Sequence, residues 1–206
     1  RSAHGAAKQV QRTIRRGYRF VVDMDLSKFF DRVQHDVLMS RVARKVRDPL
    51  LLKPIGRYLR AGVMVEGRRE ATDEGVPQGA VLSPLLANVY LHYVLDRWFT
   101  QEILPRLRGQ ASLVRYADDF ICAFELESDA RRFQDVLPKR LARFSLELAE
   151  EKTKLLRFGR FAERDSARFG EGAPGTFDFL GFTHYCGHSR AGKFKLKRKT
   201  AKKKFR

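Results

Sequence analysis

Two pairs of aspartates in this sequence have the spacing of a metal site. Asp118 and Asp119 are adjacent and lie between two short apolar segments, which places them at the turn of a predicted hairpin. Neighbouring carboxylates on partly buried strands repel each other, and a bound divalent cation would resolve that conflict. Asp23 and Asp25 stand two positions apart at the end of another apolar segment, so both side chains project to the same face of a regular strand.

These carboxylates predict magnesium chemistry. Mg²⁺ prefers hard oxygen ligands and is usually held by one or two carboxylates together with substrate phosphates. If the two acidic strands are neighbours, their carboxylates could hold two ions about 3.5–4 Å apart, one activating an attacking 3′-hydroxyl and the other stabilising the leaving pyrophosphate. An isolated Asp-Asp turn is more often a solvated hairpin turn, and it is the combination on two apolar strands that favours the metal reading.

The elements that would position these acids alternate irregularly between helix and strand. Apolar periodicity predicts helices over residues 1–16, 36–46, 49–59, from Ser83 as N-cap through Trp98, and from Ser128 towards Phe144. It predicts strands at 18–25, on both sides of the acidic turn in 112–124, at 153–158, 177–185 and 193–196, with a hairpin over 63–75 and a loop over 159–175. No glycine-rich nucleotide loop is present, so an α+β fold is expected rather than a doubly wound parallel sheet.

The charge balance indicates a polyanionic partner. Lys and Arg number 42 against 24 Asp and Glu, a net charge of +18, and neutralising phosphates releases condensed counterions. A basic surface that only aids solubility, or that binds anionic lipid, is the alternative. No apolar run approaches the ~20 residues of a membrane span, and residues 1–10 lack a secretory h-region.

The two cysteines, Cys122 and Cys186, form no CxxC pair, and this usage fits a reducing cytoplasm. Cys186 and His188 together are only a weak signal for a zinc site, because no second pair of ligands accompanies them.

Several ordered motifs resemble the reverse transcriptase family, most closely the bacterial group II intron reverse transcriptases, also called maturases. The segment 25–31 (DLSKFFD) resembles the first catalytic motif, 75–79 (GVPQG) with 81–88 (VLSPLLAN) the template and nucleotide motif, and 116–119 (YADD) the family hallmark. The resemblance runs from the first residues to the basic tail. It implies a polymerase palm, an antiparallel sheet flanked by helices, with part of the fingers, over residues 1–206.

The resemblance also assigns roles to the acidic residues and their neighbours. Asp25, Leu26, Asp118 and Asp119 match the metal ligands for two Mg²⁺ ions, with Mn²⁺ as a substitute. Lys152, in the segment 148–154 (LAEEKTK), matches a lysine thought to help pyrophosphate leave; a solvated loop lysine is the alternative.

Further residues match positions that contact the substrates. Phe30 corresponds to the steric gate that excludes a ribose 2′-hydroxyl, although core packing is the default for an aromatic side chain. Gln78 and Gly79 match a template or nucleotide contact, and Tyr116 a position near the primer terminus. Leu180 and Gly181 match the primer-grip hairpin, whose neighbouring Phe residues could equally be core.

Two departures and three alternatives accompany this reading. The fingers segment that usually precedes the first residues is missing, and the sequence stops where a helical thumb would begin, so 197–206 is expected to be a basic linker.

The function that the resemblance implies is that of a cytoplasmic RNA-directed DNA polymerase that uses an RNA template, a DNA primer and dNTPs, without membrane contact. The alternatives are an intron RNA-binding maturase, a retron or CRISPR-associated relative, and an RNA-templated RNA polymerase, against which Phe30 argues.

Overall fold

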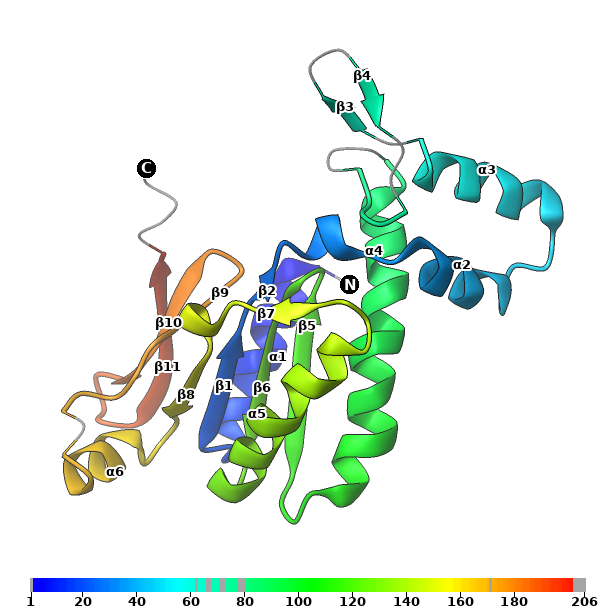
Figure 1. The fold of residues 1–206 in the computed structure, drawn as a ribbon. Coiled ribbons are helices and arrows are strands. Elements are labelled where there is room, and N and C mark those ends of the chain that lie inside the picture. The colour runs from blue at the N-terminus through cyan, green and yellow to red at the C-terminus, as the bar shows by residue number, and fades with distance from the viewer. Residues whose placement is uncertain are drawn as a thin grey trace. The chain divides into compact units, whose positions relative to one another are not determined.

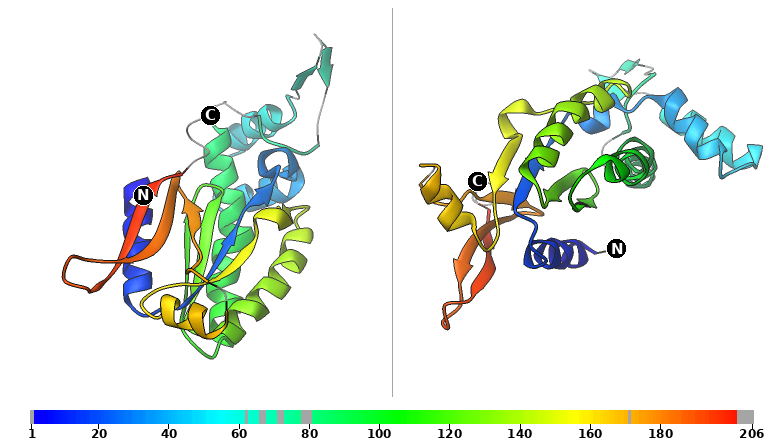
Figure 2. Two further views of the ribbon diagram at one scale, coloured as in Figure 1. Left: turned by 90° about the vertical axis from the view of Figure 1, so that its left-hand side faces the viewer. Right: turned by 90° about the horizontal axis from the view of Figure 1, so that it is seen from below.

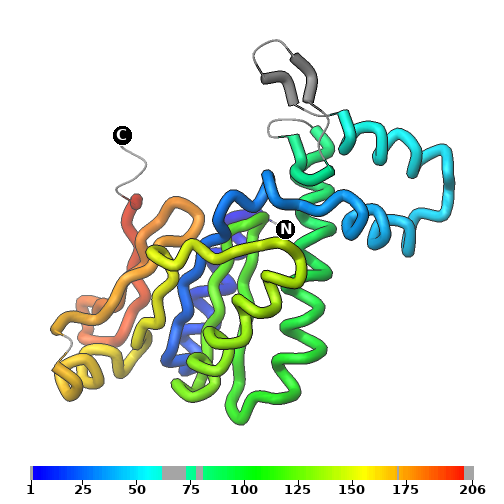
Figure 3. The backbone as a smooth tube through the Cα atoms, viewed as in Figure 1, coloured from blue at the N-terminus to red at the C-terminus, as the bar shows by residue number. Residues whose placement is uncertain are grey.

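The computed structural model describes residues 2–61, 63–65, 68–70, 73–77, 81–170 and 172–201. The chain divides into two compact units, and Figure 3 traces the backbone through them. The first unit comprises Arg1–Asp25, Gln101–Val136 and Ala149–Arg206; the second comprises Leu26–Thr100 and Leu137–Leu148. Within the described ranges, every helix falls short of the length and apolar character that a bilayer crossing requires.

A four-stranded antiparallel sheet forms the centre of the first unit (Figure 1). Its order is β5-β6-β1-β8, with β1 at Phe20–Met24, β5 at Ala111–Tyr116, β6 at Asp119–Phe124 and β8 at Lys154–Arg157. Met24 at the end of β1 lies opposite Phe120 near the start of β6, so both acidic segments leave the sheet at the same edge. The predicted neighbourhood of the two acidic strands is therefore confirmed.

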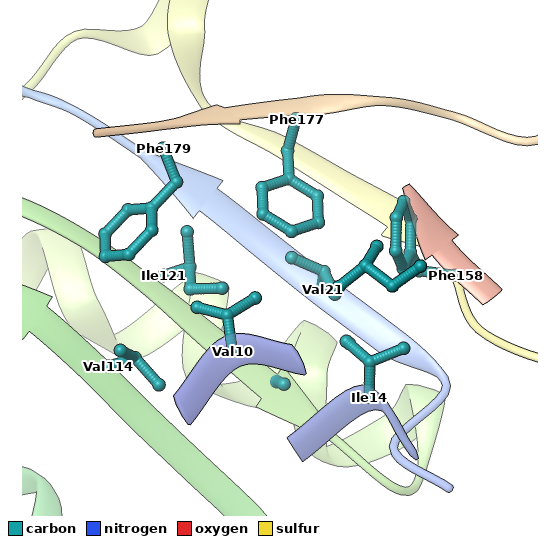
Figure 4. Close-up of a cluster of buried hydrophobic side chains, with 10 residues drawn as sticks. Val10, Ile14, Val21, Val114, Ile121, Phe158, Phe177 and Phe179 are labelled. Carbon is teal, nitrogen blue, oxygen red and sulfur yellow. The ribbon is translucent and has the colours of Figure 1, made fainter. Parts of the chain in front are cut away.

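Helices cover both faces of this sheet, which explains why its central strands are apolar along their length. Helix α1 (Ala3–Arg15) begins where the Ser2 hydroxyl accepts a hydrogen bond of 3.1 Å from the Gly5 amide. Its buried residues Val10 and Ile14 join a cluster with Val21, Val114, Ile121, Ala123, Phe158, Phe177, Phe179 and Leu196 (Figure 4). Helix α5 (Glu127–Ala142) packs on the opposite face, where the rings of Phe124 and Phe133 lie 5.3 Å apart.

A second, three-stranded sheet in this unit has the order β11-β10-β9. Strands β9 (Phe177–Phe179) and β10 (Phe182–His188) are joined by Leu180 and Gly181, both with positive φ (54° and 74°), as a tight two-residue hairpin turn requires. The strand expected over 177–185 is thus divided by a turn at Leu180 and Gly181, where the resemblance had implied a hairpin, and a second hairpin joins β10 to β11.

Two further predictions for this unit are wrong in detail. Strand β11 (Phe194–Thr200) pairs with β10 along its whole length, so residues 197–200 are strand rather than the expected basic linker, and 202–206 lie outside the described residues. Alternating Lys with apolar residues satisfied the period of a strand although the charge suggested a solvated arm. The expected loop over 159–175 contains helix α6 (Ala162–Arg168), which buries Ala162 and Ser166.

The second unit is built mainly from helices. Helices α2 (His35–Ala43), α3 (Pro49–Leu59) and α4 (Ser83–Leu91) accord with the predicted ranges. Helix α4 continues through π-helical turns at His92–Asp96 and Phe99–Ile103 to a 3₁₀ turn at Leu104–Arg106, and from Gln101 onward these residues belong to the first unit. Strands β3 (Val63–Val65) and β4 (Arg68–Glu70) form the expected hairpin, and β2 (Leu26–Ser27) pairs with β7 (Glu147–Leu148). Further 3₁₀ turns span Phe29–Arg32 in this unit and Glu150–Lys152 in the first.

Ser83 is not the N-cap of α4, contrary to prediction. It is the first helical residue and follows Leu82, whose backbone is already in the helical region. Its hydroxyl donates instead to the Pro77 carbonyl and lies 2.7 Å from the Tyr58 hydroxyl. The buried hydroxyl therefore ties the segment before the helix to α3, a contact that a local capping rule does not foresee.

Candidate active site

Five aspartates from three segments of the first unit line a single pocket of about 560 Å³. They are Asp23 and Asp25 at the end of β1, Asp118 and Asp119 at the β5–β6 turn, and Asp178 on β9. Lys152, Lys154, Leu180 and Gly181 also line it. The structure thus brings together the four aspartates singled out in the sequence, while their role as metal ligands stays a prediction.

The β5–β6 turn that carries Asp118 has an unusual backbone. Tyr116 lies opposite Asp119 in the ladder, which leaves only Ala117 and Asp118 in the turn. Ala117 has φ of 55°, a left-handed conformation that is costly for any residue with a Cβ atom. The Arg115 guanidinium donates a hydrogen bond of 2.7 Å to the Ala117 carbonyl and so stabilises this turn. The turn presents Asp118 to the pocket and leaves Tyr116 38% exposed.

The β9–β10 turn holds Asp119 in place. The Leu180 amide donates a hydrogen bond of 2.7 Å to an Asp119 carboxylate oxygen. The left-handed backbone of Leu180 allows this amide to point at the pocket. Burial raises the pKa of Asp119 to about 6, the Leu180 amide opposes the rise, and the charges of Asp118 and Asp25 add to it. This predicted primer-grip residue therefore also positions a carboxylate of the pocket.

Asp23 carries the largest perturbation among the pocket carboxylates whose shift is resolved. Burial, then the charges of Asp119 and Asp178, raise its pKa to about 7. The described lining of the pocket thus gathers five aspartates and one glutamate against two lysines, Lys152 and Lys154, an excess of negative charge that favours the binding of a cation.

Asp178 is a pocket residue that the sequence reasoning missed. It stands between the buried Phe177 and Phe179 on β9, so its exposed side chain projects to the opposite face of the strand. The Thr183 hydroxyl donates a hydrogen bond of 2.5 Å to it across the β9–β10 turn. The alternation of Phe, Asp and Phe in the sequence could have predicted this position, because a single acidic residue on an apolar strand faces either solvent or a functional site.

Lys152 provides a cation at the pocket. Its ammonium donates a hydrogen bond of 2.7 Å to Asp25, and each of the two side chains is 45% exposed. This contact raises the pKa of Lys152, so the side chain keeps its charge at neutral pH. Lys152 therefore reaches the acidic pocket, where it could meet a negatively charged substrate group.

The donor set of the pocket fits a hard divalent cation. Carboxylate oxygens are the ligands that Mg²⁺ and Mn²⁺ prefer, and their unneutralised repulsion would be relieved by such an ion. Among the described residues, no three His, Cys, Asp or Glu side chains already surround one ion position. Binding therefore requires side-chain adjustment, and Asp25, which is half-exposed and paired with the long, half-exposed side chain of Lys152, has the freedom for it.

The remaining predicted residues belong to the second unit. Leu26 is buried at the start of β2, and Phe30 lies in the 3₁₀ turn with its ring 5.2 Å from that of Phe29. The Val76 amide donates a hydrogen bond of 2.7 Å to the Phe30 carbonyl, so the segment preceding Gln78 is anchored beside Phe30. Gln78 and Gly79 themselves lie outside the described residues. The roles of these residues stay predictions.

Comparison with known sequences gives consistent matches. A family model described as reverse transcriptase (RNA-dependent DNA polymerase) matches residues 1–184. The group II intron-encoded protein LtrA of Lactococcus lactis subsp. cremoris is 30% identical over 173 residues, covering 79% of this chain and 29% of that protein. Protein YkfC of Escherichia coli K12 is 32% identical over 213 residues, covering 83% of this chain and 55% of that protein. The chain thus spans between about a third and about half of these relatives' length.

Solved structures show the same fold at low sequence identity. Apo telomerase from Candida tropicalis, truncated from its C-terminal domain, superposes with a TM-score of 0.65 and 15% identity over 95% of this chain and 39% of that one. Telomerase from Candida albicans in complex with a fragment of telomeric RNA gives a TM-score of 0.64 and 15% identity over 97% and 33%. The predicted α+β fold, an antiparallel sheet flanked by helices, is therefore confirmed.

Proposed function

The chain belongs to the reverse transcriptase family, and on this premise we propose that it carries the catalytic centre of an RNA-directed DNA polymerase. The reaction is transfer of a deoxynucleotide onto a primer 3′-hydroxyl with release of pyrophosphate. The observation that supports this proposal best is the convergence of Asp23, Asp25, Asp118 and Asp119 in one pocket, with the pKa of two of them raised by burial and mutual repulsion.

Asp25, Asp118, Asp119 and the Leu26 carbonyl are the proposed ligands of two Mg²⁺ ions, or of Mn²⁺. When bound, such ions supply the charge stabilisation that both the attacking and the leaving oxygen need in phosphoryl transfer. The protein's own contribution is to place the ligands in advance, through the Arg115 contact to the acidic turn and the Leu180 amide on Asp119. Asp23 and Asp178 line the same pocket and add their negative charge to that of these ligands.

Other residues are proposed to bind and orient the substrates. The Lys152 ammonium is placed to meet the departing pyrophosphate, since it already lies within hydrogen-bonding distance of Asp25. Phe30 is the proposed gate against ribonucleotides, Gln78 and Gly79 contact the template base pair, and Tyr116, exposed at the acidic turn, lies near the primer terminus. Leu180 and Gly181 hold the primer strand from their hairpin turn, which borders the pocket.

The element type is proposed from the relatives. LtrA is named as a group II intron-encoded protein, so we assign this chain to the group II intron type, with intron RNA as a further partner. A second candidate function, maturase activity through RNA binding alone, is favoured by the net charge of +18. The two functions make different demands on the pocket, because only the polymerase needs its carboxylates.

Primer extension tests the proposal directly. Asp118→Asn should lower Mg²⁺-dependent incorporation of dNTPs on an RNA template by on the order of 1000-fold, because charge stabilisation by a metal is worth several kcal/mol. Asp135→Asn, which changes an exposed acid of α5 outside the pocket, is the matched control and should retain activity. Equal activity of the two variants would exclude the metal assignment. Inactive wild-type chain that still binds one structured intron RNA selectively would favour the maturase function.

A further inference from the structure

The β10–β11 hairpin carries an unbalanced positive charge. Residues 182–200 contain no Asp or Glu and six Lys or Arg, which are Arg190, Lys193, Lys195, Lys197, Arg198 and Lys199. In both views of Figure 2 the end of the hairpin near residues 189–193 projects away from the rest of its unit. The aspartate pocket does not explain why so many cations lie on this exposed hairpin.

Three of these cations share one face of β11. Because side chains alternate along a strand, Lys195, Lys197 and Lys199 project to the face opposite Leu196, which is buried in the core. Lys195 and Lys199 are exposed and Lys197 is half-exposed. Among the described residues, none of the three has a carboxylate within ion-pair distance. Their charges are therefore available to a partner.

The neighbouring strand completes this surface, which we call the lysine face and define as Lys195, Lys197 and Lys199 with Tyr185. Tyr185 lies opposite Lys197 in the ladder, and the Lys199 ammonium is 5.8 Å from the Tyr185 ring centroid. Gly187 lies opposite Lys195, and a Cβ atom there would come within 3.0 Å of the Lys197 side chain, so Lys197 lies across the bare glycine. Successive lysines are about 6.6 Å apart, twice the rise per residue of a strand.

We propose that the lysine face binds a single-stranded RNA segment outside the aspartate pocket. A row of cations that follows a phosphate backbone, with an aromatic ring on which an unpaired base can stack, is the combination that single-strand binding surfaces use. The proposal goes beyond the proposed polymerase activity because it requires none of the pocket carboxylates. It shares with that activity only the expectation of a nucleic-acid partner.

Two other uses of these lysines make different predictions. Lysines on an edge strand discourage aggregation, and β11 is the edge of its sheet, but any charged or polar replacement would serve that purpose. An anionic membrane surface would also attract them, but interfacial binding needs apolar side chains to insert, and the paired positions of β10 on this face are Thr183, Tyr185 and Gly187. The aromatic ring and the absence of inserted apolar groups favour RNA.

The test is RNA affinity as a function of salt, measured with a fluorescent mixed-sequence single-stranded RNA and the full chain. Replacing the three lysines together (K195Q, K197Q and K199Q) should reduce the slope of log K against log salt by about 2, since each phosphate contact on a single strand contributes about 0.7. Tyr185→Ala should weaken binding about tenfold and Tyr185→Phe should restore it, because stacking needs the ring and not the hydroxyl.

A control with the same loss of charge replaces three exposed arginines of the same unit outside the hairpin: R106Q, R108Q and R132Q. It should leave the slope nearly unchanged. An equal effect of both triple variants, no effect of the lysine variant, or a larger loss of binding to phosphatidylserine vesicles than to RNA would each overturn the proposal. If wild-type chain extends primers while the lysine variant binds RNA normally, this inference fails and the proposed function stands. If the Asp118→Asn variant retains the full salt slope and the wild-type chain is inactive in primer extension, the proposed function fails and this inference stands.

Discussion

We predict that the buried imidazole of His184 makes this protein less stable at acidic pH. The side chain is 2% exposed and stacks on Phe177, with ring centroids 5.0 Å apart and planes inclined by 9°. Burial, then the positive charge of Arg198, lowers the pKa of His184 to about 4 from an ordinary value of 6.5. The folded state therefore holds this imidazole neutral at pH values where the unfolded chain protonates it.

The sign and size of the effect follow from proton linkage. The stabilisation is complete above pH 6.5 and is lost as the pH falls towards 4, because in that window the unfolded state binds more protons than the folded state. At about 1.4 kcal/mol per pKa unit, the loss from His184 is about 2 kcal/mol on going from pH 7.5 to pH 5, and about 3 kcal/mol at pH 4. At pH 5 this corresponds to a fall in melting temperature of about 4–8 °C for a chain of this size.

The assay compares the wild type with His184→Phe, which keeps an aromatic ring against Phe177 but cannot titrate. Urea unfolding followed by circular dichroism at pH 7.5, 6, 5 and 4.5 gives the free energy of unfolding of each protein. All other titrating groups are common to both proteins, so the difference between the two curves isolates His184. Parallel curves over this window would refute the reasoning, and so would a wild type that gains stability relative to the variant as the pH falls.

Three further predictions concern single side chains. Lys152→Ala should lower kcat for primer extension about 100-fold with little change in KM for dNTP, and Lys152→Arg should recover part of the loss; an unchanged kcat would contradict a role in pyrophosphate release. Gly159→Ala should lower the free energy of unfolding by about 1–3 kcal/mol in urea titrations, because φ is +97° and a Cβ atom would lie 3.1 Å from the Tyr18 carbonyl oxygen. Gly170→Ala is the control, because φ there is +69° but no atom lies near the added Cβ, so its loss of stability should be smaller. Equal losses in the two variants would contradict the clash. Phe30→Val should raise incorporation of ribonucleotides relative to deoxynucleotides in primer extension, whereas Phe29→Leu, a change in the buried core, should not; the same ratio in both variants would argue that Phe30 is only a packing residue.

Local patterns in the sequence were enough to predict most of the elements. The helix predicted over residues 49–59 is α3, and the Asp48 carboxylate accepts a hydrogen bond of 2.8 Å from the Leu50 amide as its cap. The apolar segments around Asp118 and Asp119 predicted a hairpin, and the structure has one. These predictions hold because caps, turns and side-chain periods are set by residues within a few positions of one another.

Where a local rule competed with a distant contact, the distant contact decided the structure. The Ser83 hydroxyl bonds to Pro77 and Tyr58 instead of capping α4. Residues 197–200 carry enough charge to suggest a solvated linker, yet they complete a strand because β10 offers them a ladder. Helix α6 formed in a segment whose polar composition predicted a loop, because Ala162 and Ser166 are buried there.

The sequence by itself was enough to predict which acids could bind a metal, to predict a polyanionic partner, and to indicate the family to which the chain belongs. Only the tertiary structure decided that Asp178 joins the pocket, that the Leu180 amide holds Asp119, and that Lys152 reaches Asp25. These contacts join residues 61 and 127 positions apart in the second and third cases. The energies of these contacts depend on the distance between the groups and on their burial, so no pattern of neighbouring residues predicts them. They form only when β1, β6 and β9 come together in the folded chain.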